Sequence, residues 1–259
     1  HTYKGCYRKE KLLALQRLYQ FSAKHQVSDI ETMTLAEEQQ FEQEFSERCG
    51  EGKKSTAFNI LRTSRKILFL QAPEIHWQAN MWFLERFHFS RERMNPSKPV
   101  DLISFKEVTN LENQKILKKY LRYLFGITDL SISTIRIKQL ELRTFLAHFN
   151  GEQKPIYEME AEKIQKYLES IQRQDTREKT ANGRIFMILQ FYNFLVVKGY
   201  LKKIPFQYEY YLQKVVHVHN DRSVPEAISM EILSKLAEFP EHLRLMFLHL
   251  WCTGIRGRW

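Results

Sequence analysis

The 259-residue sequence is poor in the residues that interrupt regular secondary structure. Its nine glycines and seven prolines are too few for a turn-rich β architecture, and they favour helices. Three scattered cysteines fit neither a metal motif nor a disulfide framework, which indicates a reducing compartment. No apolar run is long enough to span a membrane, and no signal peptide is visible. We therefore expect a mainly helical protein in the cytoplasm, without a membrane partner.

What the sequence does have is a normal globular balance with an excess of positive charge. Hydrophobic residues make up 43% and charged residues 27%, so the chain can form a buried core. Lysines and arginines number 40 against 30 acidic residues, which gives a net charge of +10. Such an excess favours nucleic acid as a partner, because cations that neutralise phosphates release counterions. A basic protein without such a partner is the alternative.

The sequence predicts no metal site and no cofactor. His217 and His219 would share one face of a strand, which is an arrangement that metal ligands use. No third ligand stands near them in the sequence, so we interpret both as histidines of a linker.

Apolar residues at three- and four-residue spacing predict a series of helices. Thr34, followed three residues later by Glu37, has the pattern of a capping box. Pro73 ends one helix, and Gly199 stands where a helix-stopping residue belongs. The predicted helices cover residues 10–22, 111–125, 133–148, 158–172, 179–198 and 230–239, with three more that begin at Thr34, at Ser55 and after Pro240.

The helices before residue 73 and those after residue 133 follow the same order. Equivalent apolar residues recur at nearly constant spacing, which indicates an internal duplication of one helical module. The alternative is that any two sets of three amphipathic helices overlay equally well. The matched pairs are Phe21 with Phe145, Met33 with Met159, and Ala57 with Ala181.

Two further stretches are rich in large apolar side chains. Aromatic residues such as Trp77 and Trp82 crowd the region between the two sets of helices, and they are more typical of a core than of a base-stacking platform. The run from Leu243 to Trp251 predicts a helix that is buried on most sides. The residues after the preceding linker are too few to enclose such a helix, so we expect the last domain to be incomplete.

These observations divide the chain into five parts. The predicted parts are an N-terminal helical domain at 1–73, an aromatic and basic connection at 74–114, a helical domain at 115–205, a linker at 206–224 and the beginning of another domain at 225–259.

Several motifs together carry a resemblance to one family. The segment SISTIRIKQLELRTFLAHF, followed by TANGRIFMILQFYNFLVVKGYL, resembles the SAM-like core-binding domain of the tyrosine recombinases, or phage integrases. The segment RSVPEAIS, a short helix and LRLMFLHLWCTGIRG resemble the opening of their catalytic domain. The resemblance covers roughly residues 115–259. It implies a mainly α fold in which SAM-like DNA-recognition domains precede the start of a mixed α/β catalytic domain. Residues before about 110 match less clearly, and are compatible with the extra domain of transposon-encoded members.

The resemblance implies that Arg256, in the Thr-Gly-Ile-Arg turn, is a catalytic arginine of an enzyme that cuts DNA through a phosphotyrosine intermediate. A planar guanidinium suits this role because it donates two parallel hydrogen bonds to phosphoryl oxygens and stays protonated. The chain departs from the family pattern after this turn, and the later His-x-x-Arg pair and tyrosine nucleophile are missing. We therefore expect an incomplete integrase or transposase that does not cut DNA by itself.

The resemblance also implies double-stranded DNA as the partner, a homo-oligomer on that DNA and a bacterial, nucleoid-associated protein. A non-catalytic DNA-binding regulator and a helical protein-interaction scaffold are the alternatives. Basic residues near helix ends would contact phosphates, and Asn182 and Gln190 could read bases. The candidate phosphate contacts are Arg177, Lys179, Arg184, Arg136 and Lys138, with Lys53, Lys54, Arg62 and Arg65 in the first half.

Overall fold

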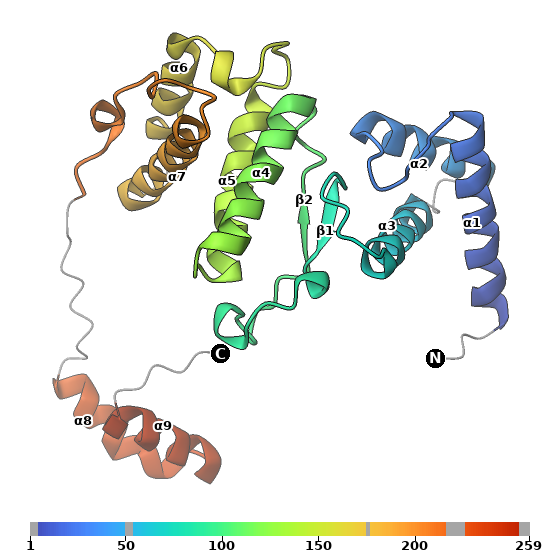
Figure 1. Cartoon of the computed structure of the whole chain (residues 1–259). Coiled ribbons are helices and arrows are strands. Elements are labelled where there is room, and N and C mark those ends of the chain that lie inside the picture. Colours follow the sequence, from blue (N-terminus) through green and yellow to red (C-terminus); the bar gives the residue numbers. More distant parts are fainter. Residues whose placement is uncertain (1–4, 50–53, 175–176, 216–225, 254–259) are drawn as a thin grey trace. The chain divides into compact units, whose positions relative to one another are not determined.

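The computed structural model describes residues 5–49, 54–174, 177–215 and 226–253, and these residues are mainly helical (Figure 1). This confirms the mainly α fold class predicted from the sequence. The chain divides into two compact units, residues 1–214 and 215–259. No helix among the described residues is long and apolar enough to cross a membrane.

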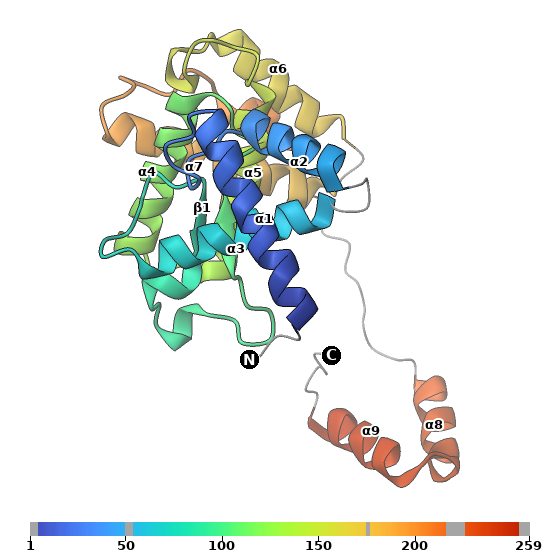
Figure 2. The ribbon, with the colours of Figure 1, turned by 90° about the vertical axis from the view of Figure 1, so that its right-hand side faces the viewer.

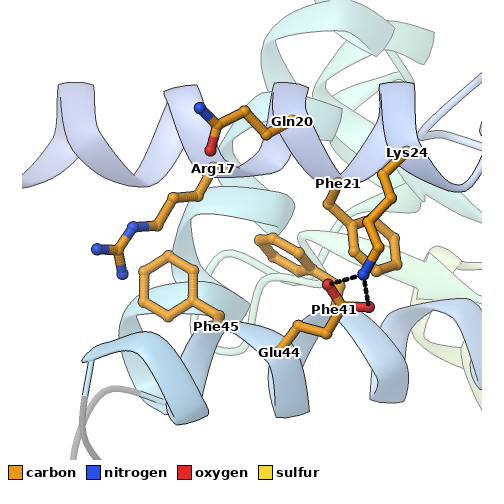
Figure 3. A pocket seen from close by; sticks show the side chains of 7 residues that line it. All are labelled: Arg17, Gln20, Phe21, Lys24, Phe41, Glu44 and Phe45. Carbon is orange, nitrogen blue, oxygen red and sulfur yellow. Dashed lines mark hydrogen bonds and ion pairs between the residues drawn. The ribbon is translucent and has the colours of Figure 1, made fainter.

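The first unit begins with three helices that pack around an apolar cluster of their own. Buried Phe21, Phe41 and Ala57 belong to this cluster, to which each of the three helices contributes. Helix α1 packs against α3, and Figure 2 shows the two crossing. The helices are α1 (Gly5–Lys24), α2 (Leu35–Cys49) and α3 (Lys54–Gln71).

The predicted capping box at the start of α2 is present. The Thr34 N–H donates to Glu37 Oε2 over 2.7 Å, and the Glu37 N–H donates to Thr34 Oγ1 over 3.2 Å. These two bonds satisfy backbone donors that the first turn of a helix leaves open, and they fix where α2 begins.

A second and larger apolar cluster joins a two-stranded sheet to four helices. Strand β1 (Met81–Phe83) pairs antiparallel with β2 (Leu102–Ser104), and Trp82 lies opposite Ile103. Trp82 and Phe105 are fully buried, which confirms that the aromatic stretch belongs to the core. The helices are α4 (Leu111–Ile127), α5 (Ile132–His148), α6 (Ala161–Gln172) and α7 (Glu178–Val197).

Local capping fixes the ends of these helices. The side chains of Asn110 and Ser131 accept backbone N–H bonds at the starts of α4 and α5. Gly199 follows α7 with a φ of 77°, a left-handed conformation that glycine adopts without strain. The N–H groups of Gly199 and Tyr200 then donate to the carbonyl oxygens of Val196 and Leu195. This Schellman pattern confirms Gly199 as the stop of α7.

The three residue pairs that relate the two halves of the sequence are all buried. Phe21, Met33 and Ala57 lie in the first cluster, and their counterparts lie in the second. An internal duplication remains a prediction, since amphipathic helices bury apolar residues at these spacings in any case.

The second unit contains α8 (Glu226–Lys235) and α9 (Glu241–Thr253) among its described residues. The apolar helix predicted after Pro240 is present as α9, and the described residues do not bury it. Leu243, Leu245 and Trp251 are 39%, 59% and 41% exposed. The described part of this unit offers α9 only one other helix and a short 3-10 turn, which leave most of its apolar surface uncovered.

Candidate DNA-binding surface

Two of the cations predicted to contact DNA lie at the N-terminal end of α7. Arg177 is the N-cap residue, Lys179 lies in the first turn, and both are exposed. The Arg177 carbonyl accepts the N–H bonds of Thr180 and Ala181, while its side chain makes no capping bond. The N-terminus of a helix carries partial positive charge, which adds to the charge of these two side chains. This end of α7 is therefore suited to bind a phosphate group.

Two more exposed cations belong to the segments that flank this end of α7. Arg173 is the C-cap residue of α6, and its side chain is 81% exposed at 3.4 Å from Glu169. Lys214 is exposed and directly follows Gln213, which is bonded to the first turns of α7. We call Arg173, Arg177, Lys179 and Lys214 the α7 basic cluster. Arg173 and Lys214 were not predicted as contacts, because one lies in a turn and the other in a segment interpreted as a linker.

Asn182 holds the segment that carries Lys214 against α7. Its Nδ2 donates to the Gln213 carbonyl, and its Oδ1 accepts from the Gln213 N–H, both over 2.8 Å. The Gln213 side chain donates in turn to the Gln172 carbonyl at the end of α6. Both polar atoms of the Asn182 side chain are therefore engaged within the protein, so the structure assigns it a positioning role in place of base reading.

Arg184, one turn further along α7, is engaged in contacts within the domain. Its Nε lies 2.7 Å from Glu141 Oε2 on α5, and its Nη1 donates to Gln174 Oε1. The side chain is 15% exposed. Arg184 therefore connects α7 with α5 and with the end of α6, and Glu141 balances its charge.

The two candidate cations of α5 are less exposed than Arg177 and Lys179. Lys138 is 8% exposed, its ammonium group donates to Gln190 Oε1, and burial lowers its pKa. Arg136 donates to Gln139 Oε1, and burial together with nearby Arg143 lowers its pKa. Burial makes Lys138 the less suited of the two to a contact with phosphate, whereas Arg136 is partly exposed and remains a predicted contact.

The candidates in the first half differ among themselves. Arg62 is exposed on α3, whereas Arg65 is 2% exposed and cannot reach DNA in the folded protein. Arg65 Nη1 lies 2.6 Å from Glu38 Oε1, and its Nε donates to the Ile30 carbonyl over 2.7 Å. We therefore assign Arg65 to the interior of the fold, where it connects α3 to Glu38 on α2. The side chains of Lys53 and Lys54, and all of Arg256, lie outside the described residues.

Comparison with known proteins gives one match. Residues 117–199 match the family model described as the phage integrase, N-terminal SAM-like domain. The match spans α5, α6 and α7 and the part of α4 from Leu117 onward. No curated protein and no solved structure was found to match the chain. Residues 117–199 thus form a SAM-like domain of the phage integrase type, which supports a relationship to the tyrosine recombinase family and a role in DNA binding.

Proposed function

We propose that this chain binds double-stranded DNA through the α7 basic cluster. The observation that carries the proposal is the position of this cluster: four exposed cations and a helix N-terminus gather at one end of a domain that matches the integrase SAM-like model. Cations and helix N-termini are the groups that proteins use to hold the DNA backbone in register. Such contacts give affinity for any sequence, and other residues then supply specificity.

Salt dependence is the direct test of this proposal. Each phosphate that a cation neutralises contributes about 0.9 to the slope of log K against log salt, so four contacts give a slope of about −3.5. We expect this slope for the whole chain on a short random duplex, measured by fluorescence anisotropy. Replacing Arg177 and Lys179 together by alanine should lower its magnitude by about 2.

A charge-matched control separates a local contact from a general effect of charge. Arg8 and Lys9 are exposed on α1, and replacing both by alanine changes the net charge by the same amount. We expect that control to keep nearly the full slope. An equal loss of slope in both double variants would show that the α7 basic cluster has no special role.

We further propose that this DNA binding serves site-specific recombination through a phosphotyrosine intermediate, by proteins assembled as homo-oligomers on their site. The family match and the Thr-Gly-Ile-Arg motif that ends in Arg256 support this step. In protein that forms the phosphotyrosine adduct, Arg256→Lys should preserve binding and reduce strand cleavage about 100- to 1000-fold, because lysine lacks the planar two-point contact to phosphoryl oxygens. The measurement is single-turnover trapping of a covalent adduct on a nicked substrate. Binding without any adduct from the unchanged protein would instead support a non-catalytic regulator.

A further inference from the structure

Three potential metal ligands meet where the loop between α1 and α2 reaches the segment that leads into β1. Glu31 Oε2 lies 3.0 Å from His76 Nδ1, and Asp29 Oδ2 lies 3.8 Å from His76 Nε2. One ligand atom from each residue can be chosen so that all three lie within 4.8 Å of one another. No local pattern of residues predicted this group, because His76 stands 45 positions after Glu31.

One oxygen of the Glu31 carboxylate is buried without a hydrogen-bond donor, which leaves it available to a cation. The Glu31 side chain is 10% exposed, and its Oε2 is bonded to His76. Its other oxygen, Oε1, is buried without a hydrogen-bond partner. A buried carboxylate oxygen without a donor is costly, and a cation bound between Glu31 and its neighbours would compensate that charge.

The backbone around these ligands is already fixed by other contacts. Asp29 Oδ1 accepts the Glu31 N–H over 2.8 Å, and Asp29 Oδ2 accepts the Thr32 hydroxyl over 3.1 Å. The Asn80 N–H donates to the Glu31 carbonyl over 2.8 Å, which joins the two segments a few residues from His76. One ion takes a single imidazole nitrogen, and tetrahedral zinc places its ligands about 3.3 Å apart. The two carboxylates, which now face different nitrogens of His76, would therefore turn toward the same one.

We propose that Asp29, Glu31 and His76 bind one divalent transition-metal cation, and that Zn²⁺ fits best. An imidazole nitrogen with two carboxylate oxygens is a donor set that zinc accepts. Side-chain exposures of 33% for Asp29 and 32% for His76 leave one side open for a water ligand. The ion would have a structural role, since it connects the α1–α2 loop with the segment that enters the sheet.

Zinc binding to the whole chain tests this site directly. After treatment with a chelator, we expect the protein to bind Zn²⁺ in isothermal titration calorimetry and to gain thermal stability with added zinc. Co²⁺ at the same site should show a visible spectrum of nitrogen and oxygen coordination, without the thiolate charge-transfer band of a cysteine site. A thiolate band, or no saturable binding, would overturn the proposal.

Substitutions then assign the ligands. His76→Gln and Glu31→Gln should each weaken this binding by more than about 100-fold, because even changes next to metal ligands cost 10- to 100-fold. The control is His88→Asn, since His88 is exposed with a left-handed φ of 48° that asparagine also tolerates. Unchanged binding in the His76 and Glu31 variants would overturn the proposal. If either variant fails to fold, the cobalt spectrum of the unchanged protein decides. DNA binding by the α7 basic cluster does not depend on either result.

Discussion

The helices α1–α3 and α5–α7 follow one order and bury matched apolar residues, yet they treat their basic residues differently. On α3, Arg65 is 2% exposed and joins Glu38, which also binds Lys106. At the start of α7, Arg177 and Lys179 remain exposed. The pattern of basic residues on α3 and α7 therefore does not by itself distinguish a cation that pairs within the fold from one that binds a ligand. The burial of a cation decides whether it can contact a ligand such as DNA.

We expect the largest difference in stability between the two sets of helices to come from Arg65. We expect Arg65→Met to lower the free energy of unfolding by about 3 kcal/mol, because Glu38 would stay buried with Lys106 as its one remaining cation. The matched change, Arg184→Met on α7, should cost about 1 kcal/mol, since its pair with Glu141 is partly solvated. Urea denaturation of both variants measures the difference. Equal losses would remove the distinction between the two sets.

The next largest expected effect is on the affinity for duplex DNA. We expect Lys179→Ala to weaken duplex binding about tenfold at 0.1 M salt, which corresponds to the loss of one phosphate contact. Arg62→Ala, the exposed cation of α3, should change the affinity less than about twofold if only the second set of helices binds. Anisotropy titrations at one salt concentration suffice. Comparable losses in both variants would show that both sets of helices bind DNA.

A third test uses a buried cation that has no carboxylate partner among the residues that the structure describes. Lys118 on α4 is 5% exposed and donates to the Gln78 carbonyl, Asn80 Oδ1 and Gln114 Oε1. Burial lowers its pKa to about 7, so between pH 7 and 10 the unfolded chain binds the proton more firmly than the folded one. The stability of the unchanged protein relative to Lys118→Met should therefore rise by about 1 kcal/mol per pH unit above pH 7.

Below pH 7 the ammonium group is protonated in both states, and the difference between the two proteins should become constant. Urea denaturation of both at several pH values measures this. A difference that does not vary with pH would mean that the three acceptors keep the pKa of Lys118 near its ordinary value.

The smallest expected effect comes from Glu178, the acidic residue between Arg177 and Lys179. Glu178→Gln should strengthen DNA binding by about twofold to fivefold, because a carboxylate next to a phosphate repels it. The same change should lower stability by about 0.3–1 kcal/mol through the lost interaction with the helix dipole. Stronger DNA binding together with lower stability would support the assignment of this end of α7 as a DNA contact. Weaker DNA binding would contradict it.

Local patterns of the sequence predicted the helices well. Apolar spacing located α1 to α7, and Thr34 with Glu37 marked the start of α2 because a capping box is a short-range device. Contacts between distant residues could not be predicted. Nothing local distinguishes Arg65, which pairs across to Glu38, from the exposed Arg62 three positions earlier. The same holds for Asn182, whose partner Gln213 is 31 positions away.

Asn80 lies between the two apolar clusters and connects the segments that carry them through hydrogen bonds. Its side-chain amide donates to the carbonyls of Thr32 and Met33, of which Met33 belongs to the first cluster, and its Oδ1 accepts from Lys118 on α4, a helix of the second cluster. Losing either cluster would leave this 5%-exposed amide half satisfied. Residues 1–214 should therefore melt in a single cooperative transition, with similar protection from amide hydrogen exchange in α3 and α4. Asn80→Ala should weaken this coupling, so that the amides of α1 exchange faster relative to those of α4 than they do in the unchanged protein.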